Sequence, residues 1–75
     1  MWSEGSIKVK DSIIHYWVKH FDEPSEEWGI DGGRISKLSL KQDGEWAANY
    51  DRGWDLKPTT EAAEIATAIL MKEYN

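Results

Sequence analysis

The 75-residue chain contains no cysteine, only two prolines and no apolar run approaching the roughly 18 residues that a membrane-spanning helix requires. Without cysteine, neither disulfides nor thiolate metal sites can stabilise the fold, so a small hydrophobic core must do so alone. The N-terminal segment MWSEGSIKVKD lacks the apolar stretch of a secretory signal. We therefore expect one domain over residues 1–75 of a cytoplasmic protein that makes no membrane contact.

Basic residues are missing from one segment. The formal net charge is −5, and five of the 14 acids lie at positions 22–31 with no Lys or Arg among them, which leaves nine acids to balance the nine bases elsewhere. The overall acidity argues weakly against a nucleic-acid partner, but the segregation of charge leaves the rest of the surface neutral. Five Trp residues are also many for this length. They serve either to close a small core or as recognition surfaces.

Two hairpins are expected from β-branched, aromatic and alternating apolar residues. Residues 6–10 and 13–21 form the first, with a two-residue turn at Asp11-Ser12 that pairs Val9 with Ile14. Five apolar side chains then share one face: Ile7, Val9, Ile14, Tyr16 and Val18. A slip of one residue would exchange the faces of the second strand.

Residues 34–41 and 45–51 form the second hairpin. A two-residue Asp43-Gly44 turn would set the apolar residues of the two strands on opposite faces, so a three-residue loop, Gln42-Asp43-Gly44, is preferred. That loop pairs Leu40 with Trp46, and it closes the hairpin with Lys41 opposite Glu45.

A C-terminal helix is predicted to begin at Pro58-Thr59-Thr60-Glu61, where one Thr caps it. An apolar stripe follows at helical spacing, formed by Ala62, Ile65, Ala66, Ile69 and Leu70. About 15 helical residues span about 22 Å, enough to cross four strands. We therefore predict an α+β fold with a four-stranded antiparallel sheet and one C-terminal helix packed on its apolar face.

Two motifs carry a resemblance. The segments GIDGGRISKLSL (29–40) and YDRGWD (50–55) resemble a family of small uncharacterised proteins, of unknown function, from Gram-positive bacteria, their phages and other mobile elements. The resemblance implies a small bacterial or phage cytoplasmic protein. It implies no activity and no catalytic residue.

The sheet face opposite the helix is expected to be basic and aromatic. Its candidate binding residues are Lys8, Lys10, His15, Trp17, Lys19, Lys37 and Lys41, with Ile13 beside them and Glu45 as the one acid. Cations around exposed rings are typical of surfaces that bind single-stranded nucleic acid. Alternatively, these lysines are solvated and protect the sheet against aggregation, or the face binds an acidic protein or a further copy of the chain.

The acidic segment DEPSEEWGIDGGR (22–34) is a second candidate. A connection this long is often functional, and Trp28 could anchor a partner, with Asp31 and Arg34 beside it. The alternatives are a solvated crossover, a lid over the basic face, a calcium loop whose spacing does not match an EF-hand, and an anion site at Gly32-Gly33-Arg34 that lacks the P-loop context.

The third candidate is NYDRGWDL (49–56), which brings together Asp51, Arg52, Trp54 and Asp55. It is interpreted either as the end of a strand, where Gly53 permits a turn and Trp54 covers the core, or as a small polar binding site. So small a fold has little room for the cleft that paired catalytic carboxylates need.

No constellation of catalytic or metal-binding residues emerges. His15, His20 and Asp22 suggest a metal, but His15 and His20 are expected on opposite faces of one strand, and no Cys or third His completes a site. We therefore expect no cofactor and no enzymatic activity, and we predict an interaction module that binds a protein partner or itself. The alternative is a nucleic-acid-binding module that uses the Lys-rich face with Trp17 and His15.

Overall fold

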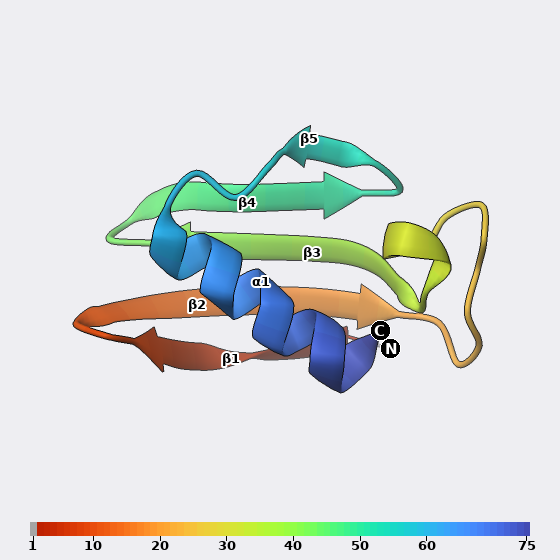
Figure 1. The fold of residues 1–75 in the computed structure, drawn as a ribbon, viewed down its shortest axis with the longest axis horizontal. Helices are drawn as coiled ribbons and strands as arrows, with labels where there is room; N and C mark the ends of the chain where they lie inside the picture. The colour runs from red at the N-terminus through yellow and green to blue at the C-terminus, as the bar shows by residue number, and fades with distance from the viewer. Residues whose placement is uncertain (1) are drawn as a thin grey trace.

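The computed structural model describes residues 2–75 as a five-stranded antiparallel sheet crossed on one face by a single helix (Figure 1). The strands lie in chain order: β1 (Trp2–Val9), β2 (Ser12–His20), β3 (Ile35–Gln42), β4 (Glu45–Asp51) and β5 (Trp54–Leu56). Helix α1 (Glu61–Tyr74) packs against β1, β2 and β3. The predicted α+β class is confirmed.

The expected count of four strands is wrong because the chain turns back after β4. Arg52 takes a left-handed conformation with φ 59°, and Tyr50 then pairs with Trp54. Gly53, which we had expected to provide the turn, does not have a positive φ. The new strand β5 has three residues, too few for an alternating pattern to reveal it.

The first hairpin turns one residue earlier than expected. The turn is Lys10-Asp11, with Lys10 at φ 55°, so Val9 pairs with Ser12 and Ile7 with Ile14. The predicted pairing of Val9 with Ile14 is therefore wrong by two residues. Because the register is wrong by an even number of residues, the side chains within the two strands keep their predicted faces. Lys10 is the exception, since it lies in the turn.

The second hairpin has the two-residue turn that the pattern argued against. Asp43 and Gly44 both have positive φ, 52° and 79°, as a type I′ turn requires. A β-bulge lets the two-residue turn coexist with a buried apolar face. Lys41 pairs with Trp46, but its neighbour Leu40 pairs with Ala48, so one residue of β4 is skipped in the ladder. The extra residue is Ala47. The predicted three-residue loop, with Trp46 opposite Leu40 and Lys41 opposite Glu45, is therefore wrong.

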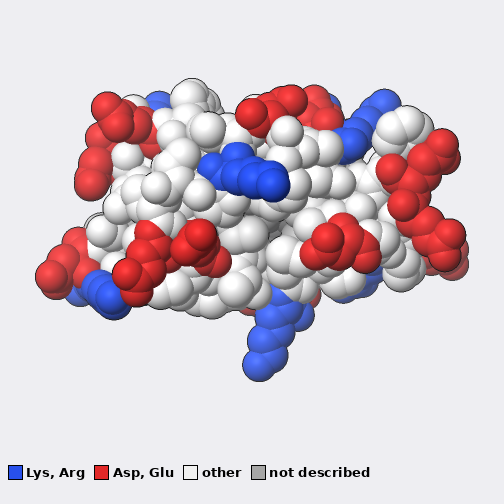
Figure 2. Space-filling view, turned by 45° about the horizontal axis from the view of Figure 1, so that its top comes forward, with Lys and Arg blue, Asp and Glu red and all other residues white. Residues whose placement is uncertain are grey.

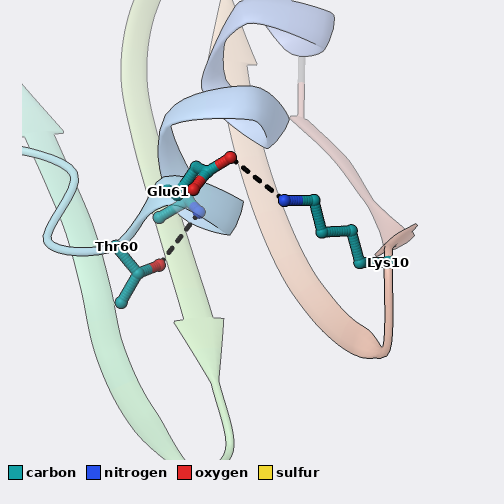
Figure 3. A network of polar contacts seen from close by, with 4 residues as sticks. Lys10, Thr60 and Glu61 are labelled. Atoms are coloured by element: carbon teal, nitrogen blue, oxygen red, sulfur yellow. Dashed lines mark hydrogen bonds and ion pairs between the residues drawn. The ribbon is translucent and has the colours of Figure 1, made fainter.

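Helix α1 begins where it was predicted to begin. The Thr60 hydroxyl accepts a hydrogen bond from the Ala63 N–H at 3.0 Å, which satisfies one of the free donors of the first turn. The Lys10 ammonium contacts Glu61 at 3.1 Å and links the first hairpin to this helix end (Figure 3).

The face of α1 that packs on the sheet is rotated from the predicted stripe. Ala63, Ala66, Thr67 and Leu70 are buried, whereas Ile65 and Ile69 are exposed. Small residues let the helix approach closely, and the Thr67 hydroxyl satisfies its own hydrogen bond by donating to the Ala63 carbonyl at 2.8 Å. The core therefore forms between α1 and one face of the sheet.

The connection from β2 to β3 is attached to that core at one end of the sheet. It contains a short 3-10 helix, η1 (Ile30–Gly32), and the side chain of Ile30 is fully buried. The Asn75 side chain donates to the Ile30 carbonyl at 3.0 Å and accepts from the Ile35 N–H at 2.9 Å. The C-terminal residue thus fastens the crossover. In Figure 1 the crossover lies beyond the strand ends, so the expected alternative of a lid over the basic face is wrong.

Candidate functional site

The face of the sheet opposite α1 is the candidate site, because no other element of residues 2–75 packs on it. We call it the open face. Cross-strand pairing arranges its side chains in rows, and their members are Trp2, Glu4, Ser6, Lys8, Ile13, His15, Trp17, Lys19, Lys37, Ser39, Lys41, Trp46, Asn49, Asp51 and Leu56. Six of the seven predicted binding residues belong to this set. Lys10 does not, since it turns towards α1.

Aromatic rings occupy the middle of the open face. The Trp17 ring centroid lies 4.4 Å from that of His15 and 5.6 Å from that of Trp46. Trp46 reaches this cluster because the bulge at Ala47 reverses its direction. Trp2 is 57% exposed, Ile13 62% and Trp46 55%, so large apolar groups meet solvent on this one face.

Two lysines lie over the exposed rings. The Lys41 nitrogen is 5.1 Å from the Trp46 centroid, and the Lys19 nitrogen is 5.7 Å from the Trp2 centroid. Such contacts are worth about 0.5–1 kcal/mol at exposed sites. Lys19 is also directly paired with Lys37, a neighbour of like charge, across β2 and β3. The cations therefore border the aromatic surface.

The open face also carries two acids, Glu4 and Asp51, that the sequence pattern did not predict there. Glu4 contacts the His15 Nε2 at 2.8 Å, and Asp51 lies 3.8 Å from the Lys37 nitrogen. Glu45, expected as the one acid of this face, instead pairs with Gln42, whose side chain contacts Ser12 and Thr60 on the helix side. Four lysines against two carboxylates leave the open face positive.

A groove of about 420 Å³ lies beside the aromatic cluster, lined by Ser39, Trp46, Asn49 and Leu56. At its base the Ser39 hydroxyl donates to the Asn49 Oδ1 at 3.0 Å. The lining thus combines one ring, one aliphatic side chain and two polar side chains that bond to each other.

Ser6, His15 and Glu4 lie in line on the open face. The Ser6 hydroxyl is 3.4 Å from the His15 Nδ1, and Glu4 contacts the other ring nitrogen. The order resembles a hydrolytic triad, but His15 and Glu4 are well exposed and Ser6 lies in the middle of a strand. A nucleophilic serine is normally presented on a strained turn beside oxyanion donors.

The acidic crossover and the NYDRGWDL segment meet at the end of the sheet where β2 and β4 finish (Figure 1). The Arg52 guanidinium lies 5.5 Å from the Trp28 ring centroid, and the Tyr50 hydroxyl donates to the Trp28 carbonyl at 3.3 Å. Trp28 is 43% exposed, and the Ser25 hydroxyl accepts from its N–H. Two candidate motifs, distant in sequence, therefore form one cluster. Figure 2 shows acidic side chains gathered at this end of the molecule, at the right of the view.

The remaining candidate residues of these two motifs are Asp31, Arg34, Trp54 and Asp55. Asp31 has a left-handed φ of 51°, and the Arg34 carbonyl accepts from the Phe21 N–H at 2.8 Å. The Trp54 ring packs edge-on against Tyr50 at 5.1 Å, whereas Asp55 is exposed. Within residues 2–75, Arg52 contacts Trp28 rather than forming the expected ion pair with Asp51 or Asp55. NYDRGWDL thus contains the end of β4, the bend at Arg52-Gly53 and the whole of β5.

Two tyrosines have raised pKa values. A side-chain hydrogen bond with Tyr74 raises the pKa of Tyr16, with burial as the next cause. Burial raises the pKa of Tyr50, and the Asp31 carboxylate adds to the effect. Both are held as neutral phenols at physiological pH. His15 and His20 lie at separate places, beside Trp17 and Tyr74 respectively, and within residues 2–75 no three His, Asp or Glu side chains gather as a metal site would require.

The comparisons with known proteins place the chain in a family. The family described as Domain of unknown function (DUF7678) matches residues 1–75. The chain belongs to this family. No curated protein and no solved structure matches the chain. Within the described part of the chain, no helix is both long and apolar enough to cross a membrane.

Proposed function

We propose that this chain is a small non-enzymatic interaction module that binds a protein partner, or a further copy of itself, through the open face. The observation that carries this proposal is the exposure of Trp2, Ile13 and Trp46 together on a face that neither α1 nor the crossover covers. Large apolar side chains that a small protein leaves exposed on one face are candidate contacts for a partner. Trp is enriched among the residues that dominate binding energy.

The charges favour an acidic partner. Lys19 and Lys41 lie over exposed rings and Lys8 lies opposite Ile13, whereas the two acids of the face contact His15 and Lys37. Complementary charge speeds association and sets specificity. The Ser6–His15–Glu4 arrangement supports no hydrolytic role in this proposal, because Ser6 lies within a strand and not on the strained turn that normally presents a nucleophilic serine. The resemblance noted in the sequence adds the expected setting. The protein would act in the cytoplasm of a Gram-positive bacterium, encoded by the bacterium itself or by one of its phages or mobile elements.

Site-specific photocrosslinking tests this proposal. A photoreactive phenylalanine analogue replaces Ile13 or Trp46 on the open face, and Ile65, an equally apolar exposed residue of α1, provides the matched control. We expect a partner to be captured at positions 13 and 46 but not at 65. The capture at position 13 should be lost in Lys41→Glu. Equal capture at all three positions, or none, would contradict the proposal.

A second candidate is single-stranded nucleic acid, favoured by the two Lys–Trp pairs and the His15–Trp17–Trp46 ring cluster. Bases stacking on such rings gain about 1–3 kcal/mol each. Isotope-labelled protein titrated with a short oligonucleotide at low salt should then shift the amides of Lys8, Trp17 and Lys41. Salt should reverse these shifts, since phosphate contacts release counterions. Amides that do not move would exclude this candidate.

A further inference from the structure

Strand β1 is an unusually open sheet edge. It has eight residues, and its pairing with β2 runs without interruption from Trp2 opposite Lys19 to Val9 opposite Ser12. Natural edge strands are protected by short length, proline or bulges. The opposite edge, β5, has three residues and an irregular register, whereas β1 is long, regular and free of proline, and is protected only by the charges of Glu4 and Lys8. Figure 1 shows β1 at the outer side of the sheet.

The free backbone groups of this edge belong to alternate residues. Val9 and Ser12 flank a two-residue turn, and such flanking residues form the hydrogen-bonded closing pair of a hairpin. Antiparallel pairs alternate between bonded and non-bonded types. The N–H and C=O groups that face away from β2 are therefore those of the even-numbered residues, Trp2, Glu4, Ser6 and Lys8.

The side chains of these residues are self-complementary. We propose that β1 pairs antiparallel with β1 of a second copy across a two-fold axis at Ser6. Glu4 then lies opposite Lys8 of the second copy, and the same pair recurs on the other side of the axis. Opposite charges directly across a strand pair stabilise it. An axis at Gly5 or Ile7 would instead place Lys8 opposite Trp2 or Ser6.

The core side of the strand fits the same register. Ile7 lies opposite Gly5 of the second copy, where the Tyr16 ring of that copy covers the glycine, so Ile7 meets an aromatic ring. The two sheets become one, with both open faces on the same side. An interface made only by strand edges is smaller than the roughly 1,200 Å² of a stable complex, so the dimer forms at high concentration.

Cysteine scanning reads this register directly, because the chain has no native cysteine. Paired residues of an antiparallel ladder have Cα atoms about 5.5 Å apart, within disulfide range. Ser6→Cys should oxidise to a covalent dimer. Glu4→Cys and Lys8→Cys alone should not, since four residues of displacement is about 13 Å, but a mixture of the two should form the heterodimer. Glu64→Cys on α1 reports the rate of random collision.

Charge exchange provides an independent measurement by light scattering over a concentration series. The wild type should approach twice the monomer mass at high concentration. Glu4→Lys and Lys8→Glu should each weaken dimerisation about tenfold, because two attractive pairs become repulsive. The double variant should recover it, since the pair is restored in reverse. Lys8→Glu leaves the Glu4–His15 contact intact, and circular dichroism checks that each variant is folded.

Three outcomes would overturn the proposal: a wild type that stays monomeric throughout, a double variant that does not recover, or cross-linking at position 6 no faster than at position 64. A heterologous strand captured at β1 would likewise replace self-pairing. This inference is independent of the proposed function, because photocrosslinking at Trp46 reports the open face whether or not β1 pairs.

Discussion

Gly29 offers a sharp test of the crossover, because a single added methyl group has nowhere to go. A Cβ at this position would overlap the carbonyl oxygen of Gly33 and press on the carbonyl of Ser25. Gly29 has φ −79° and ψ 149°, which any residue adopts, so the constraint is close packing of two backbone segments and not backbone strain.

The expected cost of Gly29→Ala follows from what must move. Overpacking of a filled site costs about 1–3 kcal/mol. The Gly33 carbonyl accepts a 2.8 Å hydrogen bond from the Ser25 N–H, and displacing it costs about 1 kcal/mol more. The sum, about 2–4 kcal/mol, is a large fraction of the stability of so small a domain. We expect the urea midpoint, followed by tryptophan fluorescence, to fall accordingly.

Gly53→Ala is the matched control. It is half-buried in the bend between β4 and β5, but no atom lies within 4 Å of its Cβ position, and its φ is not positive. It should change the free energy of unfolding by less than about 1 kcal/mol, with a small gain from the reduced entropy of the unfolded chain. If Gly29→Ala proves as mild as this control, the crossover does not pack as described.

Three further changes test other parts of the fold. Trp46→Ala should cost less than about 1.5 kcal/mol, because the ring is outward, whereas Leu38→Ala in the core should cost about 2–5 kcal/mol; equal losses in urea denaturation would favour the register without the bulge. Thr60→Ala should cost about 1 kcal/mol through loss of the helix cap, and Thr60→Ser should recover most of it. The raised pKa of Tyr50 contributes stability that is fully present below pH about 10 and is lost as the pH rises through the raised value, so Tyr50→Phe should flatten the alkaline decline measured by urea midpoint against pH.

The faces of the first hairpin followed from the sequence better than its register did. The alternation of Ile7, Val9, Ile14 and Val18 is strict, so any even shift buries the same side chains. Extending the alternation to Trp2 and Glu4 would have added both to the open face. The turn itself carried no such signal, because Lys10 adopts a left-handed conformation for which lysine has no preference.

Trp46 was misplaced because hydrophobicity alone cannot reveal a bulge. The Asp43-Gly44 turn is a strong local signal, and it conflicts with the apolar pattern only if the ladder is regular. Ala47 resolves the conflict by adding one residue to β4. Likewise, the isoleucines of α1 predicted the wrong helix face, because close approach to the sheet selected the small Ala63 and Ala66 instead.

The same bulge links the fold to the candidate function. With a regular ladder and a three-residue loop, Trp46 would fill the core, and the open face would carry lysines around Trp17 alone. With Ala47 inserted, two adjacent alanines face the helix side, and Trp46 joins Trp17 in a ring pair bordered by Lys41. Trp46 is thereby exposed to solvent instead of filling the core. Since burial of a Trp would stabilise so small a domain, the exposure of Trp46 is the feature of the fold on which the proposed open-face interaction depends.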